Sequence, residues 1–85
     1  MRILLINPNT SVEMTDRIAA EAIRHADGGS EIVAVTANFG CEVIASRASF
    51  AIAAHAALDT YADHASGIDA VLLACFGDPG LAALR

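Results

Sequence analysis

Residues 69–85 read DAVLLACFGDPGLAALR, an apolar run that stops at a cysteine and continues into a turn and a helix-like tail. The run over 68–74 is nearly continuous in apolar side chains, as expected for a parallel strand covered on both faces. Asp78 and Pro79 suit the N-cap and the first position of a helix, so a helix is expected to begin there. This stretch therefore predicts a strand, a turn that begins at Cys75, and a helix.

The same pattern precedes this stretch twice. Short runs of branched apolar residues at 2–6 and 31–36 predict two further buried strands. Apolar spacing and alanine content predict helices at about 12–26 and 47–65. The order β-α-β-α-β-α predicts the α/β class, as a three-stranded parallel sheet with helices on its faces.

The first helix has its own start signal and apolar face. Thr10 and Glu13 have the spacing of a capping box. Apolar residues recur at helical spacing and predict the face that packs on the sheet. This face consists of Met14, Ile18, Ala19, Ala22, Ile23 and Ala26.

Length, charge and cysteine content restrict the classes of function. The chain has 85 residues, enough for one small domain, and a net charge of −5 with no lysine. Nucleic-acid binding depends on clustered basic residues, so the charge argues against it. The apolar runs are shorter than a membrane span, and no signal peptide is visible. Two cysteines without secretory features predict reduced thiols and a cytoplasmic location.

Ligands of open parallel sheets bind beyond the carboxyl ends of the strands, which makes Cys75 the most informative residue. A helix N-terminus close behind it would lower the pKa of its thiol. The backbone N–H groups of Phe76, Gly77 and Asp78 could hold a carboxylate or enolate oxygen. The alternative is that Cys75 is only the last small apolar residue of a strand.

Other polar residues follow the first two strands. Asn7 and Asn9 offer amide groups to a polar ligand, although the same residues would also form a turn and a helix entry. Cys41 has no assigned task. If the first strand is central, the loops of Cys41 and Cys75 lie about 10 Å apart, too far for a disulfide. The three histidines show no metal-ligand spacing.

The motifs ILLINPNTSVEMT and LLACFGDPGL, in this order, resemble the aspartate/glutamate/hydantoin racemase superfamily, most closely its hydantoin and allantoin racemases. The resemblance implies a cofactor-independent enzyme of two similar α/β lobes, each supplying one cysteine. One thiolate removes the α-proton of the substrate, and the other thiol protonates the opposite face. The implied substrates are 5-substituted hydantoins or related ureides, and the full-length form is expected to be a homo-oligomer.

Residue by residue, the resemblance assigns Cys75 as the catalytic cysteine of the first lobe. It assigns the backbone amides of Phe76 and Gly77 to the substrate oxygens, and Asn7 and Asn9 to the loop that lines the cleft. Ser46 corresponds approximately to a polar position in the second loop. No metal or cofactor is implied.

The sequence also departs from the family pattern. The family chain is longer, so residues 1–85 are interpreted as an apparently truncated N-terminal lobe without the second cysteine. This chain alone is expected to be inactive. Cys41 lies in the same lobe and is not assigned as that second cysteine. Two alternatives stay open: a maleate isomerase or arylmalonate decarboxylase type of enzyme, and an inactive fragment or small binding module.

Overall fold

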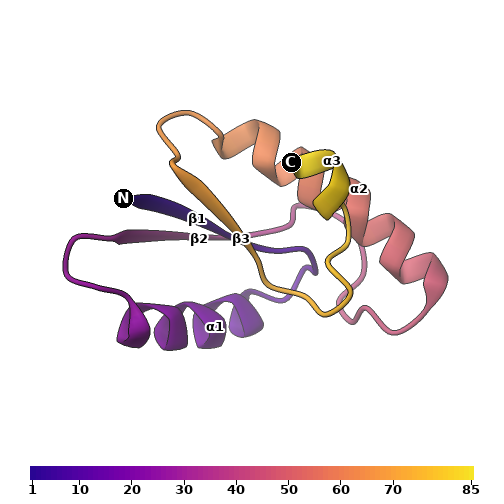
Figure 1. Ribbon diagram of the computed structural model, residues 1–85. Coiled ribbons are helices and arrows are strands. Elements are labelled where there is room, and N and C mark those ends of the chain that lie inside the picture. The colour runs from indigo at the N-terminus through magenta and orange to yellow at the C-terminus, as the bar shows by residue number, and fades with distance from the viewer.

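The computed structural model describes residues 1–85 and contains three strands and three helices in alternation (Figure 1). The predicted order β-α-β-α-β-α is confirmed. The elements are β1 (Arg2–Asn7), α1 (Val12–His25), β2 (Glu31–Thr36), α2 (Arg47–His64), β3 (Ala70–Leu73) and α3 (Leu81–Leu84).

The sheet is parallel, with strand order β2-β1-β3, so β1 is central as expected. The chain first crosses from β1 to β2 and then from β2 past β1 to β3. These crossovers run in opposite directions, so α1 covers one face of the sheet while α2 and α3 cover the other (Figure 1). In doubly wound sheets, ligands bind beyond the carboxyl ends of the two neighbouring strands at which the crossover direction reverses. In this sheet those strands are β1 and β3.

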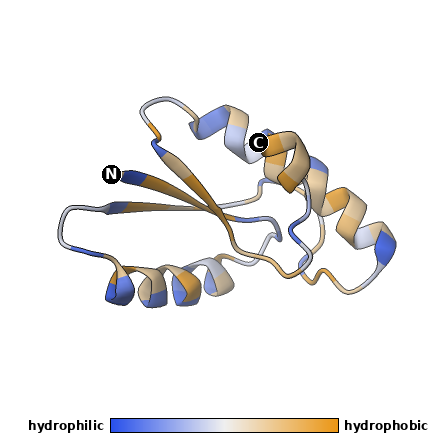
Figure 2. Cartoon of the chain, viewed as in Figure 1, coloured by the Kyte–Doolittle hydropathy of each residue, from blue (hydrophilic) through white to orange (hydrophobic).

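The core lies between β1 and α2. Leu4 and Ile6 are fully buried and pack with Ala57 of α2, while Leu5 is buried on the opposite face of the sheet. Buried Ala53 and Ala56 extend the contact face of α2, because methyl side chains let a helix approach its neighbours closely. Figure 2 shows the resulting apolar layer along the strands and along α2.

The helix α1 differs from its prediction in two details. Its N-cap is Ser11, whose hydroxyl accepts a hydrogen bond from the backbone N–H of Met14 at 3.2 Å, so the predicted capping box of Thr10 and Glu13 is wrong. Its one buried residue is Thr15, whereas Met14 and Ile23 are exposed. The face of α1 that packs on the sheet is therefore rotated toward Thr15 relative to the prediction. The hydroxyl of Thr15 is hydrogen-bonded within the protein.

The third helix begins later than predicted. Asp78 has a φ of 51°, outside the extended range of an N-cap, and α3 starts at Leu81 behind Gly80, whose φ is 82°. The side chain of Pro79 is fully buried, so the turn packs against the protein before the helix begins. Consequently the backbone of Cys75 is separated from α3 by a complete turn.

Candidate functional site

The three loops that follow the strands meet at one end of the sheet (Figure 1). A cleft of about 330 Å³ lies there, and four predicted residues line it: Asn7, Asn9, Cys75 and Phe76. The rest of its wall is mainly apolar, with one carboxylate, and comes from α1, the loop after β2 and the residue after β3: Met14, Ile18, Glu42, Val43, Ile44 and Ala74. Cys75 thus faces a hollow with both an apolar wall and polar groups, as small-molecule sites usually have.

Cys75 is half-buried, and its thiol contacts the carbonyl oxygen of Phe76 at 3.4 Å. Burial raises the pKa of Cys75, because the thiolate loses hydration, and the Asp78 carboxylate raises this pKa further by charge repulsion. The expected lowering of this pKa is therefore wrong for this structure. It depended on a helix beginning at Asp78, where the structure instead places an acidic turn.

The backbone after Cys75 presents hydrogen-bond donors. The N–H groups of Cys75, Phe76 and Gly77 donate to no other protein atom, whereas the Asp78 N–H closes the turn onto the Cys75 carbonyl at 3.2 Å. Of the three predicted donors, Asp78 is thus occupied. Phe76 and Gly77 retain N–H groups that could hold a ligand oxygen.

Gly77 and Gly80 give this turn its shape. Gly77 has a φ of 82°, and a Cβ added there would lie 2.9 Å from Cε2 of Phe50. Gly80 has the same φ, and a Cβ there would lie 3.0 Å from the backbone oxygen of Ala54 on α2. A left-handed backbone and close packing both require glycine at these two positions. The turn therefore packs directly against α2.

Asn7 and Asn9 lie at the end of β1 and behave differently. The Asn7 side chain is buried and occupied: its Nδ2 donates to the hydroxyl of Thr15 at 2.9 Å and to Oδ1 of Asn9 at 2.8 Å. Asn9 is only partly buried, and its Nδ2 has no partner within the protein. Asn9 is therefore the residue of this pair that retains a free polar group beside the cleft.

Ser46 lies outside this cleft, in a neighbouring hollow of about 660 Å³ that shares Ile44 and Phe76 with it. Ser46 is the N-cap of α2, and its hydroxyl accepts a hydrogen bond from the backbone N–H of Ser49 at 3.1 Å. Ser49 returns the contact, since its hydroxyl accepts from the Ser46 N–H at 2.8 Å. The observed contacts of Ser46 are those of a capping box.

Two residues beside the site were not predicted. The hydroxyls of Thr15 in α1 and Thr36 in β2 form a hydrogen bond of 2.6 Å, and Thr15 also contacts Asn7. Thr15 could have been found, because it is spaced three residues before Ile18 on the predicted apolar face. Thr36 carried no signal, since threonine is an ordinary strand residue.

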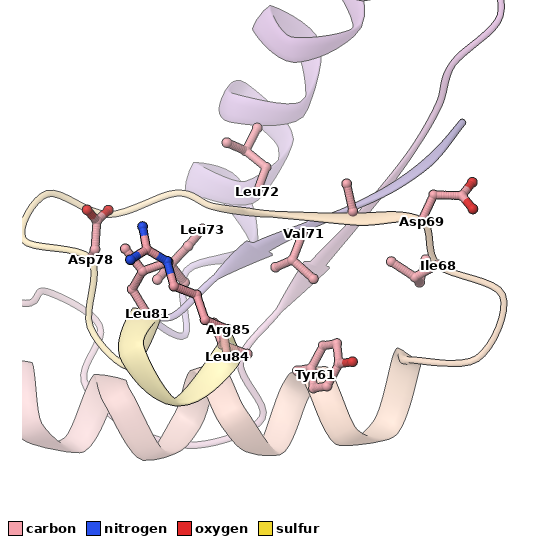
Figure 3. Close-up of a pocket in the computed structure, with 11 residues that line it drawn as sticks. Tyr61, Ile68, Asp69, Val71, Leu72, Leu73, Asp78, Leu81, Leu84 and Arg85 are labelled. Atoms are coloured by element: carbon pink, nitrogen blue, oxygen red, sulfur yellow. The ribbon is translucent and has the colours of Figure 1, made fainter.

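A third hollow lies away from Cys75. It measures about 480 Å³ and follows the outer edge of β3 (Figure 3). Val71 and Leu73 point from the strand toward α3 and Tyr61 of α2, while Leu72 points to the opposite face. It contains no cysteine or histidine, and its lining is mainly apolar.

No group of three or more His, Cys, Asp or Glu side chains is arranged to hold a metal ion. None of the helices combines the length and apolar character needed to cross a membrane.

Comparison with known proteins shows the family of the chain. A family model described as Asp/Glu/hydantoin racemase matches residues 3–85. A hydantoin racemase from Paenarthrobacter aurescens is 37% identical over 87 residues, covering 100% of this chain and 37% of the relative. A hydantoin racemase from Pseudomonas sp. (strain NS671) is 36% identical, covering 100% of this chain and 34% of the relative.

Solved structures agree with this family. An allantoin racemase from Klebsiella pneumoniae superimposes with a TM-score of 0.92 at 45% identity, covering 98% of this chain and 34% of that one. An allantoin racemase from Pseudomonas fluorescens gives a TM-score of 0.88 at 37% identity, covering 92% of this chain and 33% of that one. The chain thus spans about one third of the length of these relatives.

Proposed function

Because the chain belongs to the Asp/Glu/hydantoin racemase family, we propose that residues 1–85 act as the first lobe of a cofactor-independent racemase. The substrate class is a 5-substituted hydantoin or a related ureide such as allantoin. The relatives named above as hydantoin and allantoin racemases support this class over maleates and arylmalonates.

One observation carries the proposal: the thiol of Cys75 and unpartnered backbone N–H groups occur together at the ligand-binding end of the sheet. The α-carbon of a hydantoin is acidified by its neighbouring carbonyl. When a base removes the α-proton, the electron pair of the C–H bond moves onto that carbonyl oxygen. The N–H groups of Phe76 and Gly77 would stabilise the resulting enolate oxygen.

The raised pKa of Cys75 indicates the protonation state of its thiol in this lobe. At neutral pH the residue is a protonated thiol, which suits delivery of a proton to the enolate carbon. In the reverse direction the resulting thiolate removes the α-proton from the same face. The proton on the opposite face is exchanged by a second group outside residues 1–85. In this proposal the 85 residues alone do not racemise the substrate.

Substitution of Cys75 tests the proposal in the complete protein of natural length. Cys75→Ala should lower the racemisation of allantoin or another 5-substituted hydantoin by about 10²-fold to 10⁴-fold, the usual contribution of a positioned acid or base. Loss of optical rotation and α-proton exchange in D₂O measure this. Cys41→Ala is the matched control and should retain activity. Racemisation that survives Cys75→Ala at the parent rate would contradict the role of Cys75.

A further inference from the structure

We propose that Thr36 and Thr15 act through Asn7 as positioning residues, which hold Asn9 with its amide nitrogen toward the ligand. The inference rests on the proposed function and specifies the first loop of that site. It makes the loop a hydrogen-bond donor, so the ligand group that meets Asn9 is an acceptor such as a carbonyl oxygen.

The orientation of the Asn7 amide follows from its neighbours. Its Oδ1 accepts a hydrogen bond from the backbone N–H of Asn9 at 3.3 Å. Its Nδ2 lies 3.1 Å from the backbone oxygen of Ser11 and 2.9 Å from the Thr15 hydroxyl. A flipped amide would place an oxygen against a carbonyl and a nitrogen against an N–H donor. Only one orientation is therefore compatible with these partners.

Asn7 in turn determines the orientation of Asn9. The Oδ1 of Asn9 receives two donors, Nδ2 of Asn7 at 2.8 Å and the backbone N–H of Ser11 at 2.9 Å. A nitrogen in that place would face two N–H groups, so the acceptor oxygen must occupy it. The Nδ2 of Asn9, with both of its hydrogens, is left without a protein partner and belongs to a residue that lines the cleft.

The two threonines complete the chain of hydrogen bonds. Thr36 has one hydroxyl contact, with Thr15 at 2.6 Å, and Thr15 also contacts the backbone oxygen of Ser11 at 3.2 Å. The contacts of the two hydroxyls are satisfied when Thr36 donates to Thr15 and Thr15 donates to the Ser11 carbonyl. Thr15 then accepts from both Thr36 and Asn7, which uses its full hydrogen-bonding capacity. This arrangement ties the ends of β1 and β2 and the first turn of α1 to one amide orientation.

Steady-state kinetics of the complete protein with allantoin tests the inference. Asn9→Asp keeps the acceptor oxygen and removes the donor hydrogens, so KM should rise about tenfold while kcat changes less than about threefold. Thr36→Val should raise KM about threefold to tenfold, because the Thr15 hydroxyl that accepts from Asn7 loses its own hydrogen-bond donor. Thr36→Ser keeps the hydroxyl and should restore the parent KM. The KM of the double variant Asn9→Asp/Thr36→Val should be no higher than the KM of Asn9→Asp alone.

An unchanged KM in Asn9→Asp, or fully additive effects in the double variant, would overturn the inference. Positioning can also be followed without a substrate, from the side-chain NH₂ signals of Asn9 in the ¹⁵N NMR spectrum. These signals should move in Thr36→Val and stay in place in Thr36→Ser. If they do not move in Thr36→Val, the positioning role is wrong even in an active racemase. If the parent protein racemises no hydantoin or ureide, the proposed function fails while the NMR comparison still judges the positioning.

Discussion

Cys75 shows how one turn changes the chemistry of a side chain. A thiol before a helix N-terminus is stabilised as thiolate, whereas a thiol beside a carboxylate and partly removed from water is stabilised as the neutral form. The structure places Cys75 in the second situation, with burial as the larger cause and Asp78 as the smaller. The raised pKa of Cys75 therefore favours the neutral thiol.

Substitution of Asp78 should move this equilibrium. Asp78→Asn removes the charge repulsion, so the pKa of Cys75 should fall, while burial keeps it above the ordinary value. In a Cys41→Ser background, alkylation of Cys75 by iodoacetamide should be faster than in the parent at a fixed pH below the ordinary thiol pKa of about 8.5. The profile of alkylation rate against pH should move to lower pH.

Asp16→Asn is the control, since this carboxylate is exposed on α1 and forms no ion pair. It should leave the alkylation rate unchanged. Equal rates in Asp78→Asn and its parent would show that Asp78 does not influence the thiol.

At the scale of elements, the turn after β3 is held in place by its packing against α2. Gly80 lies against the backbone of Ala54, and buried Pro79 fills the space beside it. The alanine-rich surface of α2 makes this approach possible, because a larger residue would keep the turn away from the helix. The position of Cys75 thus depends on two elements distant in sequence.

Gly80→Ala should destabilise the fold. The left-handed backbone alone costs an alanine about 1–2 kcal/mol, and the Cβ would press on the Ala54 carbonyl, which cannot move without displacing α2. Denaturant unfolding should show a free energy of unfolding lower by at least about 1 kcal/mol.

Gly28→Ala is the matched control, because its added Cβ meets nothing within 4 Å and its φ is not left-handed. Its midpoint should stay close to that of the parent. Equal unfolding midpoints for Gly80→Ala and Gly28→Ala would mean that the packing of the turn against α2 contributes nothing to stability.

At the scale of the whole molecule, residues 1–85 leave much apolar surface uncovered. Only 13 of the 85 residues are buried, and β3 is an edge strand whose Leu72 is 46% exposed. On the other face of the strand, the groove in Figure 3 adds apolar surface between β3 and α3. Edge strands with exposed apolar side chains promote pairing with another chain.

Residues 1–85 produced alone should therefore self-associate. Size-exclusion chromatography should show an apparent mass above 8.8 kDa that rises with concentration. Leu72→Lys should shift the chain toward monomer, since a charge on the edge strand opposes pairing. Ile23→Lys is the control, on an exposed position of α1, and should leave association unchanged. A clean monomer with a sharp, high thermal transition would contradict this expectation and would favour a self-contained binding module.

The sequence by itself determined the α/β class, the order of elements and the family, because these depend on apolar periodicity and on motifs within single segments. It predicted β2 to the residue and four of the residues that line the cleft. It misplaced the start of α3, because the backbone of Asp78 and Gly80 is set by packing on α2.

Only the tertiary structure decided the state of the site. The pKa of Cys75 depends on burial and on Asp78, and the orientation of Asn9 depends on hydroxyls from α1 and β2. Burial and hydrogen-bond partners arise between segments far apart in the chain, so no local pattern contains them. Local residue types determine which chemical groups reach the cleft, whereas tertiary packing decides their protonation and direction.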